Sequence, residues 1–416
     1  MKVKHPTIVP CLLIVTCCLL FVGCSHQKDG QPTLPLLHVQ DQYVLTEQGD
    51  TLYVYGVNLG FWLNPEGYSW LIPERQCNSP RLMNDLVSQM VGPEQAALFW
   101  RTFQERYITE DDIRYIASKG ANTVRLPFHY ALLTDDDYMG YTSRQGFQYI
   151  DSAIIWCRRA GLYVILDMHD CPAGQTGDNI DDSYGYPFLF FSPQAQTRFC
   201  SLWREIAQHY CNENTVLGYE LMNEPIAHYF TDSVQDTITC RLEPLYARCV
   251  DSIRSVDDRH IILLGGSRWN GSFDLFTGSI TDTNIIYACH RYGHSADEEG
   301  IKDFIRFRDS LNVCMVMTET GHRNQSWLEQ QAATLRRNNI GLTWWPYKKL
   351  RGSSWMRIGV PEDWQLIQQF AVADRTDFAS IRTHRPDPVR TQKALNAFLD
   401  SMLFVHCHPD TIYSNL

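Results

Sequence analysis

The sequence predicts an α/β fold, a single (β/α)8 barrel, from three observations. Eight short apolar runs, rich in β-branched and aromatic residues, alternate with longer segments of helical character. The runs are nearly continuous in their apolar residues, which is typical of parallel strands covered on both faces. No internal repeat and no break in composition indicates a solenoid or a second domain. The predicted strands are residues 51–60, 122–128, 163–169, 216–224, 260–266, 284–292, 313–320 and 341–347.

The predicted helices lie between these strands, as a barrel of this type requires. Two connections are long and are predicted as loops: residues 61–108 after the first strand and residues 170–193 after the third. The predicted helices are residues 109–119, 144–160, 194–210, 235–255, 299–311 and 324–338, with a last one at 388–403 after the eighth strand.

The N-terminus predicts a targeting segment. In residues 1–23, two lysines precede an apolar run that is short for a membrane span, and the ending FVGCS resembles a bacterial lipoprotein signal. We therefore expect lipidation at Cys24 and a place on the bacterial cell envelope, at the outer membrane or in the periplasm; an ordinary secretory signal is the alternative. Residues 24–40 are polar and predict a tether. The barrel domain is expected at 41–405, followed by a tail at 406–416.

Composition excludes one class of partner and favours another. The formal net charge is −11, so a basic face for nucleic acid is not expected. Aromatic residues make up 12% of the chain, which suits stacking on sugars. Ten cysteines remain after Cys24, without a C-x-x-C pair, so neither a zinc ribbon nor a redox motif is indicated. We expect a monomer without a cofactor, in which most of these thiols are buried.

Polar and aromatic residues recur at the C-terminal ends of the predicted strands, where barrels of this type carry their active sites. Six of the eight strands end in such groups. The two-residue period of a strand puts Glu220 and Glu224 on one face, so Asn223 points away unless the chain bulges before Pro225. We expect such a bulge. The strand-end residues are Arg125, His169, Asn223, Glu224, His290, Tyr292, Glu319, Trp344 and Trp345.

Two carboxylates facing each other across a barrel mouth are the pair that glycoside cleavage needs. Glu319 is expected to be the nucleophile, held ionised by Arg125 and by the Tyr292 hydroxyl. Glu224 is expected to be the acid, because burial and the nearby negative charge raise its pKa. The remaining contacts are to the sugar: Asn223 is expected to bind the 2-hydroxyl, and Trp345 to form an apolar floor.

Some of the same residues also fit other interpretations. His169 and His290 fit satisfied core histidines as well as a binding site. With Asp167, Asp170 and His294 they also suggest metal ligands, but no known ligand spacing emerges, so no metal site is predicted. The acidic run DNIDDS fits a solvated loop better than a Ca²⁺ site. Glu220 is expected to be structural, with an arginine or histidine partner.

These motifs resemble glycoside hydrolase family 5, the cellulase and exo-glucanase family. The matching segments are NTVRLPFHY, VILDMHDCPAGQ, GYELMNEP, YACHRY, VMTETG and LTWWPYK, in the family's order. The resemblance implies a (β/α)8 barrel, Glu224 as acid/base and Glu319 as nucleophile. It implies substrate-binding roles for Arg125, His169, Asn223, His290, Tyr292 and Trp345.

Further segments are similar to the branch of the family that contains exo-β-glucanases. GVNLGFWLNPEG and GQTGDNIDD imply that Glu66 and Asn179 line a terminal sugar site. TETG and the pair Asp170–Cys171 depart from the family's usual residues. Trp269, after the fifth strand, is a further candidate sugar platform.

The sequence thus predicts a retaining glycosidase acting on a β-linked glucan. A mannan or xyloglucan backbone is the alternative substrate. A non-catalytic, glycan-binding lipoprotein is the alternative from another class of protein; it would be expected to have lost one of the two carboxylates, and both are present.

Overall fold

The computed structural model describes residues 33–73, 76–136, 138–139, 146–178 and 180–413. Cys24, the predicted lipidation site, and Asn179, a predicted sugar-site residue, lie outside the described residues.

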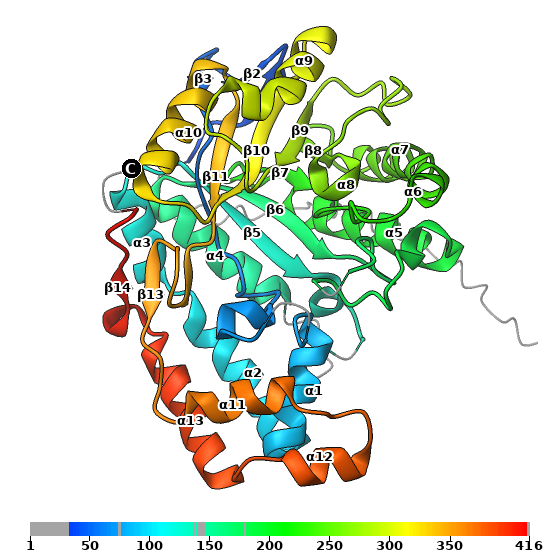
Figure 1. Cartoon of the computed structure of the whole chain (residues 1–416). Helices are drawn as coiled ribbons and strands as arrows, with labels where there is room; N and C mark the ends of the chain where they lie inside the picture. The colour runs from blue at the N-terminus through cyan, green and yellow to red at the C-terminus, as the bar shows by residue number, and fades with distance from the viewer. Residues whose placement is uncertain (1–32, 74–75, 137, 140–145, 179, 414–416) are drawn as a thin grey trace, which may run out of the picture. The chain divides into compact units, whose positions relative to one another are not determined.

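Eight parallel strands close into a barrel, and each contains the centre of a predicted strand (Figure 1). Their order around the barrel is β10-β11-β4-β5-β6-β7-β8-β9. Every described residue of β5, β6 and β10 is buried, because the barrel interior covers one face and helices cover the other. The strands are β4 (Tyr55–Asn58), β5 (Thr123–His129), β6 (Tyr163–Asp170), β7 (Val216–Glu220), β8 (Ile261–Gly265), β9 (Ile285–His290), β10 (Cys314–Gly321) and β11 (Gly341–Trp345).

The helices around the barrel also follow the prediction, with one split. The helix expected at 235–255 is divided into α6 (Asp232–Thr239) and α7 (Leu242–Arg254). The others are α3 (Glu110–Ser118), α4 (Gly146–Ala160), α5 (Pro193–Tyr210), α9 (Lys302–Leu311), α10 (Gln325–Arg337) and α13 (Pro388–Ser401).

The prediction of a loop at 61–108 is wrong. This connection contains the 3-10 helix η1 (Gly67–Trp70) and the helices α1 (Pro80–Val91) and α2 (Pro93–Tyr107). Both α-helices have a proline in their first turn, where its missing N–H costs nothing. Only Gly92, at a positive φ of 91°, separates them, so the sequence lacks the polar spacer that marks two helices.

Helices α1 and α2 form a helical group with α11 (Trp364–Val372) and α13, gathered beside the barrel in Figure 1. Aromatic rings form its core: the ring centroid of Trp70 lies 5.4 Å from that of Trp100 and 5.3 Å from that of Trp364. The short helix α12 (Phe378–His384) has no buried residue. The group belongs to the same compact unit as the barrel.

Two small sheets change the predicted domain limits. Strand β1 (Leu37–Gln40) pairs with β2 (Tyr43–Thr46), so the end of the expected tether is part of the fold. Strand β14 (His408–Pro409) pairs with β13 (Met356–Ile358), so the expected tail is partly ordered as well. Strands β3 (Thr51–Leu52) and β12 (Lys348–Leu350) complete these sheets.

A buried ion pair, here called the Lys348 cluster, ties the helical group to the barrel. Lys348 Nζ lies 2.6 Å from Asp112 Oδ1 and donates to the carbonyl oxygens of Tyr107 and Met402. Asp112 also accepts from the Tyr347 hydroxyl at 2.9 Å. The three N–H groups of the ammonium thus each have an acceptor.

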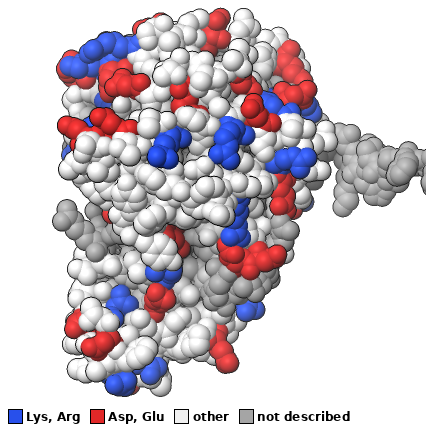
Figure 2. Space-filling view, turned by 90° about the vertical axis from the view of Figure 1, so that its right-hand side faces the viewer, with Lys and Arg blue, Asp and Glu red and all other residues white. Residues whose placement is uncertain are grey.

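The surface carries both signs of charge. On the face seen in Figure 2, acidic and basic residues are interspersed and neither forms a continuous field. Within the described residues, no helix is long and apolar enough to cross a membrane.

Candidate active site

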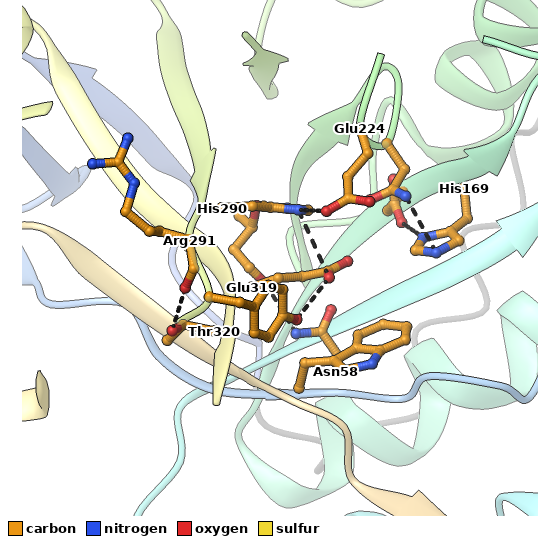
Figure 3. A network of polar contacts seen from close by, with 12 residues as sticks. Asn58, His169, Glu224, His290, Arg291, Glu319 and Thr320 are labelled. Carbon is orange, nitrogen blue, oxygen red and sulfur yellow. Dashed lines mark hydrogen bonds and ion pairs between the residues drawn. The ribbon is translucent and has the colours of Figure 1, made fainter. Parts of the chain in front are cut away.

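The polar residues predicted at the strand ends meet at one end of the barrel. Figure 3 shows Glu224, Glu319, His290 and His169 pointing toward one another from different strands and loops. Glu224, Glu319 and His169 border a cavity of about 1100 Å³. Trp344 is the exception, since its ring packs near Tyr413 and not in the cavity. Of the predicted set, the cavity is lined by His169, Glu224, Tyr292, Glu319 and Trp345, and by the further candidates Glu66 and Trp269.

Glu224 reaches the cavity from a bend, so the expected bulge before Pro225 is wrong. Strand β7 ends at Glu220, four residues earlier than predicted. The chain then turns, with Glu224 at a positive φ of 42°. The loop after β6 fixes this bend, since Gln175 donates to the Asn223 carbonyl and Thr176 to the Glu224 carbonyl. A left-handed residue at such a bend carries backbone strain, which is typical of functional sites.

Glu319 is placed by a bulge in another strand. The register of β10 shifts between Met317 and Glu319, so Thr318 is the extra residue. The side chains of Thr318 and Glu319 therefore both reach into the barrel. Glu319 Oε1 accepts from Arg125 Nη1 at 2.6 Å, and Oε2 accepts from the Tyr292 hydroxyl at 3.0 Å.

Arg125 is the centre of a buried network, here called the mouth cluster. Its guanidinium contacts the carboxylates of Asp167 at 3.0 Å, Glu220 at 2.7 Å and Glu319 at 2.6 Å. Its side chain has no exposed surface. The cluster also contains Asn58, whose side-chain oxygen accepts from Arg125 at 2.9 Å. Three carboxylates thus surround one guanidinium.

Asn223 and His169 extend this network towards the cavity. Asn223 Oδ1 accepts from Arg125 Nη2 at 2.9 Å. His169 lies 2.7 Å from Asp167, and this carboxylate raises the pKa of His169 to about 10, although burial lowers it. The acidic neighbours of His169 therefore favour its protonated form.

Glu224 and Glu319 face each other across the cavity. One carboxylate oxygen of Glu224, one of Glu319 and one ring nitrogen of His290 all lie within 4.8 Å of one another. His290 Nδ1 is 2.9 Å from Glu224 and 3.7 Å from Glu319. The two carboxyl groups therefore lie close enough to influence each other's ionisation.

The environment separates the two carboxyl groups in acidity. Burial, and then the charge of Glu319, raises the pKa of Glu224 well above its usual range. Burial also raises the pKa of Glu319, but there the Arg125 guanidinium opposes the shift most strongly. These surroundings favour the proton on Glu224 over Glu319.

Aromatic rings line the cavity around this pair. Trp345 Nε1 donates to the Tyr68 hydroxyl at 2.8 Å, which fixes the plane of the indole. The ring of His169 lies parallel to it at 5.5 Å. Trp269 lines the wall next to Glu224, in a turn whose residues Arg268, Trp269 and Asn270 all have positive φ.

Several residues of the site escaped the sequence prediction. Asn58 is the last residue of β4, so a search for polar residues at strand ends with the correct strand limits would have found Asn58. Thr318 was hidden, because strand periodicity puts it on the face opposite Glu319 and only the bulge brings it inward. Tyr68 lies in the connection that was expected to be a loop, and no sequence pattern marks it.

Two groups of side chains in the described residues have the composition of metal ligands. One is Glu224, His290 and Glu319, whose contacts are given above. The other is His129 with Asp170 and Asp182, at 3.3 and 3.2 Å from its Nε2. His129 Nδ1 accepts from the Ala131 N–H, so its proton sits on Nε2 and bonds the carboxylates. This second group ties the loop after β6 to β5.

The chain belongs to the cellulase family, glycosyl hydrolase family 5, whose model matches residues 87–350. It is 33% identical over 199 residues to endoglucanase C of Acetivibrio thermocellus, covering 48% of this chain and 54% of that protein. It is 30% identical over 258 residues to a β-xylosidase of Phanerodontia chrysosporium, covering 62% and 52%. The chain therefore spans about half the length of the curated relatives it matches.

Solved structures share the fold. A β-glucanase of Saccharophagus degradans superposes with a TM-score of 0.52 at 17% identity, covering 89% of this chain and 95% of that one. An endogalactoceramidase gives a TM-score of 0.55 at 19% identity, covering 75% of each chain. At this identity the likeness concerns the barrel alone, which is known to carry many chemistries.

Proposed function

We propose that this protein is a retaining glycoside hydrolase that cleaves β-glucosidic bonds of a β-glucan by a two-glutamate double displacement. The observation that carries the proposal is the separation of Glu224 and Glu319, whose oxygens lie within 4.8 Å of each other. Retaining glycosidases hold their carboxyl groups roughly 5 Å apart, whereas inverting ones need roughly 6.5–9.5 Å to admit water.

In the first step Glu319 attacks the anomeric carbon while Glu224 gives its proton to the departing glycosidic oxygen. The bonds from Arg125 and Tyr292 leave the Glu319 carboxylate ionised and fix its direction. The products of this step are a glycosyl ester on Glu319, an ionised Glu224 and the free leaving alcohol.

In the second step water enters from the side of Glu224. Glu224 takes a proton from that water as its oxygen attacks the anomeric carbon, and the ester bond to Glu319 breaks. Both carboxyl groups return to their starting states. Two inversions at the same carbon retain its configuration.

The substrate assignment rests on the relatives and on the cavity. The relatives include an endoglucanase and a probable glucan 1,3-β-glucosidase of Aspergillus fumigatus, which is 29% identical over 255 residues. Trp345 offers an apolar floor to the C–H face of a pyranose. Residues of two connections, Glu66 and Tyr68 after β4 and Asp178 after β6, wall the cavity, which favours a short or blocked cleft.

The test is a product profile on laminarin, cello-oligosaccharides, mixed-linkage glucan and mannan, run beside Glu224→Gln. Products from a glucan that are absent in the variant support the proposal and define linkage and endo or exo action. Products from mannan alone would replace the β-glucan by the alternative backbone. No product from any of them would favour a glycan-binding protein.

A second experiment separates the roles of the two glutamates. Azide ion is a small nucleophile that needs no base. In Glu319→Ala it should enter on the face that Glu319 occupied and, by a single inversion, give the α-glycosyl azide from a β-substrate. In Glu224→Ala it should attack the glycosyl ester and give the β-anomer. Exchanged products would reverse the assignment.

We also propose that the protein is exported and held on the cell envelope by lipid on Cys24. The support is the FVGCS ending after a short apolar run. Cys24→Ala should move the protein from the membrane fraction to the soluble fraction. An unchanged distribution would contradict the lipid anchor.

A further inference from the structure

We propose that Glu220 and Thr318 are positioning residues that set the tautomer of His290 and thereby keep the proton on Glu224. The inference rests on the proposed role of Glu224 as the acid and deepens it. Neither residue is used in the two steps above, and both are fully buried below the cavity.

The chain of contacts starts from Arg125. Its Nε and Nη2 donate to both oxygens of Glu220, at 2.7 and 2.9 Å. Burial raises the pKa of Glu220 to about 7, while the Arg125 guanidinium lowers it. Because both oxygens of Glu220 accept from this guanidinium, Glu220 faces Thr318 as a hydrogen-bond acceptor.

Thr318 connects Glu220 to His290 by two hydrogen bonds. Its single O–H donates to Glu220 Oε1 at 3.2 Å. The same Oγ1 lies 2.9 Å from His290 Nε2 and, with its proton already used, has only a lone pair to offer. His290 Nε2 must therefore carry a hydrogen.

His290 has only this one ring proton. Burial, and then the positive charges of Arg125 and His169, lowers the pKa of His290 well below its usual range, so the ring is neutral. Its Nδ1 then presents a lone pair to Glu224 Oε1 at 2.9 Å. Two lone pairs at this distance repel, so the short contact requires Glu224 to donate its proton.

The other charged groups that face Glu224 do not fix the position of its proton. Glu319 and Glu66 favour the protonated form by their charge, whereas His169 and Arg125 oppose it. Among the described residues, His290 is the hydrogen-bond partner of the Glu224 carboxyl group. Its tautomer is therefore the contact that distinguishes acid from carboxylate.

This arrangement assists both steps of the reaction. When Glu224 releases its proton to the leaving oxygen, its new negative charge faces the Nδ1 lone pair. The carboxylate is thus a stronger base toward the water of the second step. In the opposite tautomer an Nδ1–H would stabilise the carboxylate, so Glu224 would lose its proton at a lower pH before the first step and would be a weaker base in the second.

The test compares three threonine variants by the pH dependence of kcat/KM. Thr318→Val removes the acceptor of Nε2–H, so His290 is free to turn its proton toward Glu224. The alkaline limb of kcat/KM should then move to lower pH by about one unit or more. At a pH above the limb, each unit of this shift lowers kcat/KM by about tenfold. Thr318→Ser keeps the hydroxyl and should restore the wild-type limb.

Thr320→Val is the matched control on the same strand. Its hydroxyl donates to the Arg291 carbonyl at 2.7 Å, away from the carboxyl pair, as Figure 3 shows. It should leave the alkaline limb in place. A Thr318→Val enzyme that is slower but keeps the wild-type limb would overturn the proposal and leave Thr318 a packing residue.

A measurement on the wild-type protein needs no variant and no activity. The ¹⁵N shifts of the His290 ring report which nitrogen carries the proton. A proton on Nε2 between pH 7 and 8 supports the proposal, and a proton on Nδ1 would overturn it. If Glu224→Gln leaves hydrolysis unchanged, the proposed function fails, but the tautomer still answers the present question.

Discussion

The mouth cluster and the Lys348 cluster are both buried ionic networks, yet they are built differently. In the Lys348 cluster one ammonium meets one carboxylate, and neither side chain has exposed surface. Every N–H of Lys348 has an acceptor. In the mouth cluster three carboxylates surround Arg125, and His169 contacts only one of them.

The difference indicates which feature distinguishes a functional site from a structural ion pair. A balanced and fully bonded ion pair ties segments together and has nothing left for a ligand. In the mouth cluster the charge of Glu319, together with burial, raises the pKa of the neighbouring Glu224, so that carboxyl group keeps its proton. Imbalance of charge, more than burial itself, separates the site from the scaffold.

The largest expected effect is the loss of activity in Glu319→Ala. Without the nucleophile, kcat/KM should fall by roughly 10⁴-fold or more. The melting temperature should stay within a few degrees of the wild type, since two carboxylates still pair with Arg125. Hydrolysis of an aryl β-glucoside and a thermal melt measure both. A large loss of stability would show that Glu319 is needed for folding and would remove the distinction between the mouth cluster and the Lys348 cluster.

Glu224→Gln should have the next largest effect. Removing the acid should cost roughly 10²–10⁴-fold with a poor leaving group, and less with an activated one. The wild-type pH profile should be bell-shaped, falling on the acid side as Glu319 gains a proton and on the alkaline side as Glu224 loses one. The raised pKa of Glu224 puts the alkaline limb well above the usual range of a carboxyl group. In Glu224→Gln the alkaline limb should be absent; its persistence would assign it to another group.

Lys348→Met should act in the opposite sense, on stability and not on chemistry. It leaves Asp112 buried without its cation, which costs about 3–5 kcal/mol of unfolding free energy. Urea denaturation measures this loss, and activity per folded molecule should remain. Lys393→Met, in an exposed pair with Glu362, is the control and should change stability by less than about 1 kcal/mol. Equal effects of the two would remove the distinction between the clusters.

The smallest and sharpest comparison is a pair of tyrosines. Tyr292→Phe removes a hydrogen bond to Glu319 and should lower kcat by about tenfold with little change in stability. Tyr347→Phe removes a hydrogen bond to Asp112 and should cost about 1–3 kcal/mol of stability with kcat retained. Kinetics and melts on both variants should give opposite patterns. The same pattern in both would contradict the division of roles.

The sequence predicted the barrel well and the helical group badly. Each barrel strand is an apolar run between polar connections, so it can be recognised from the local sequence alone. Helices α1 and α2 were missed because they follow each other with only Gly92 between them. Their partners, α11 and α13, lie almost 300 residues further on, so no local pattern indicates that these faces pack together.

Sequence patterns alone indicated most of the groups that the site contains. Arg125, His169, Asn223, Glu224, His290, Glu319 and Trp345 were found because parallel strands end at one edge of a barrel. The tertiary structure decided their states: the bend at Glu224, the bulge at Thr318 and the chain from Glu220 to His290. The reason is physical. A strand's period fixes the face on which a residue lies, but acidity depends on burial and on charges brought from remote strands.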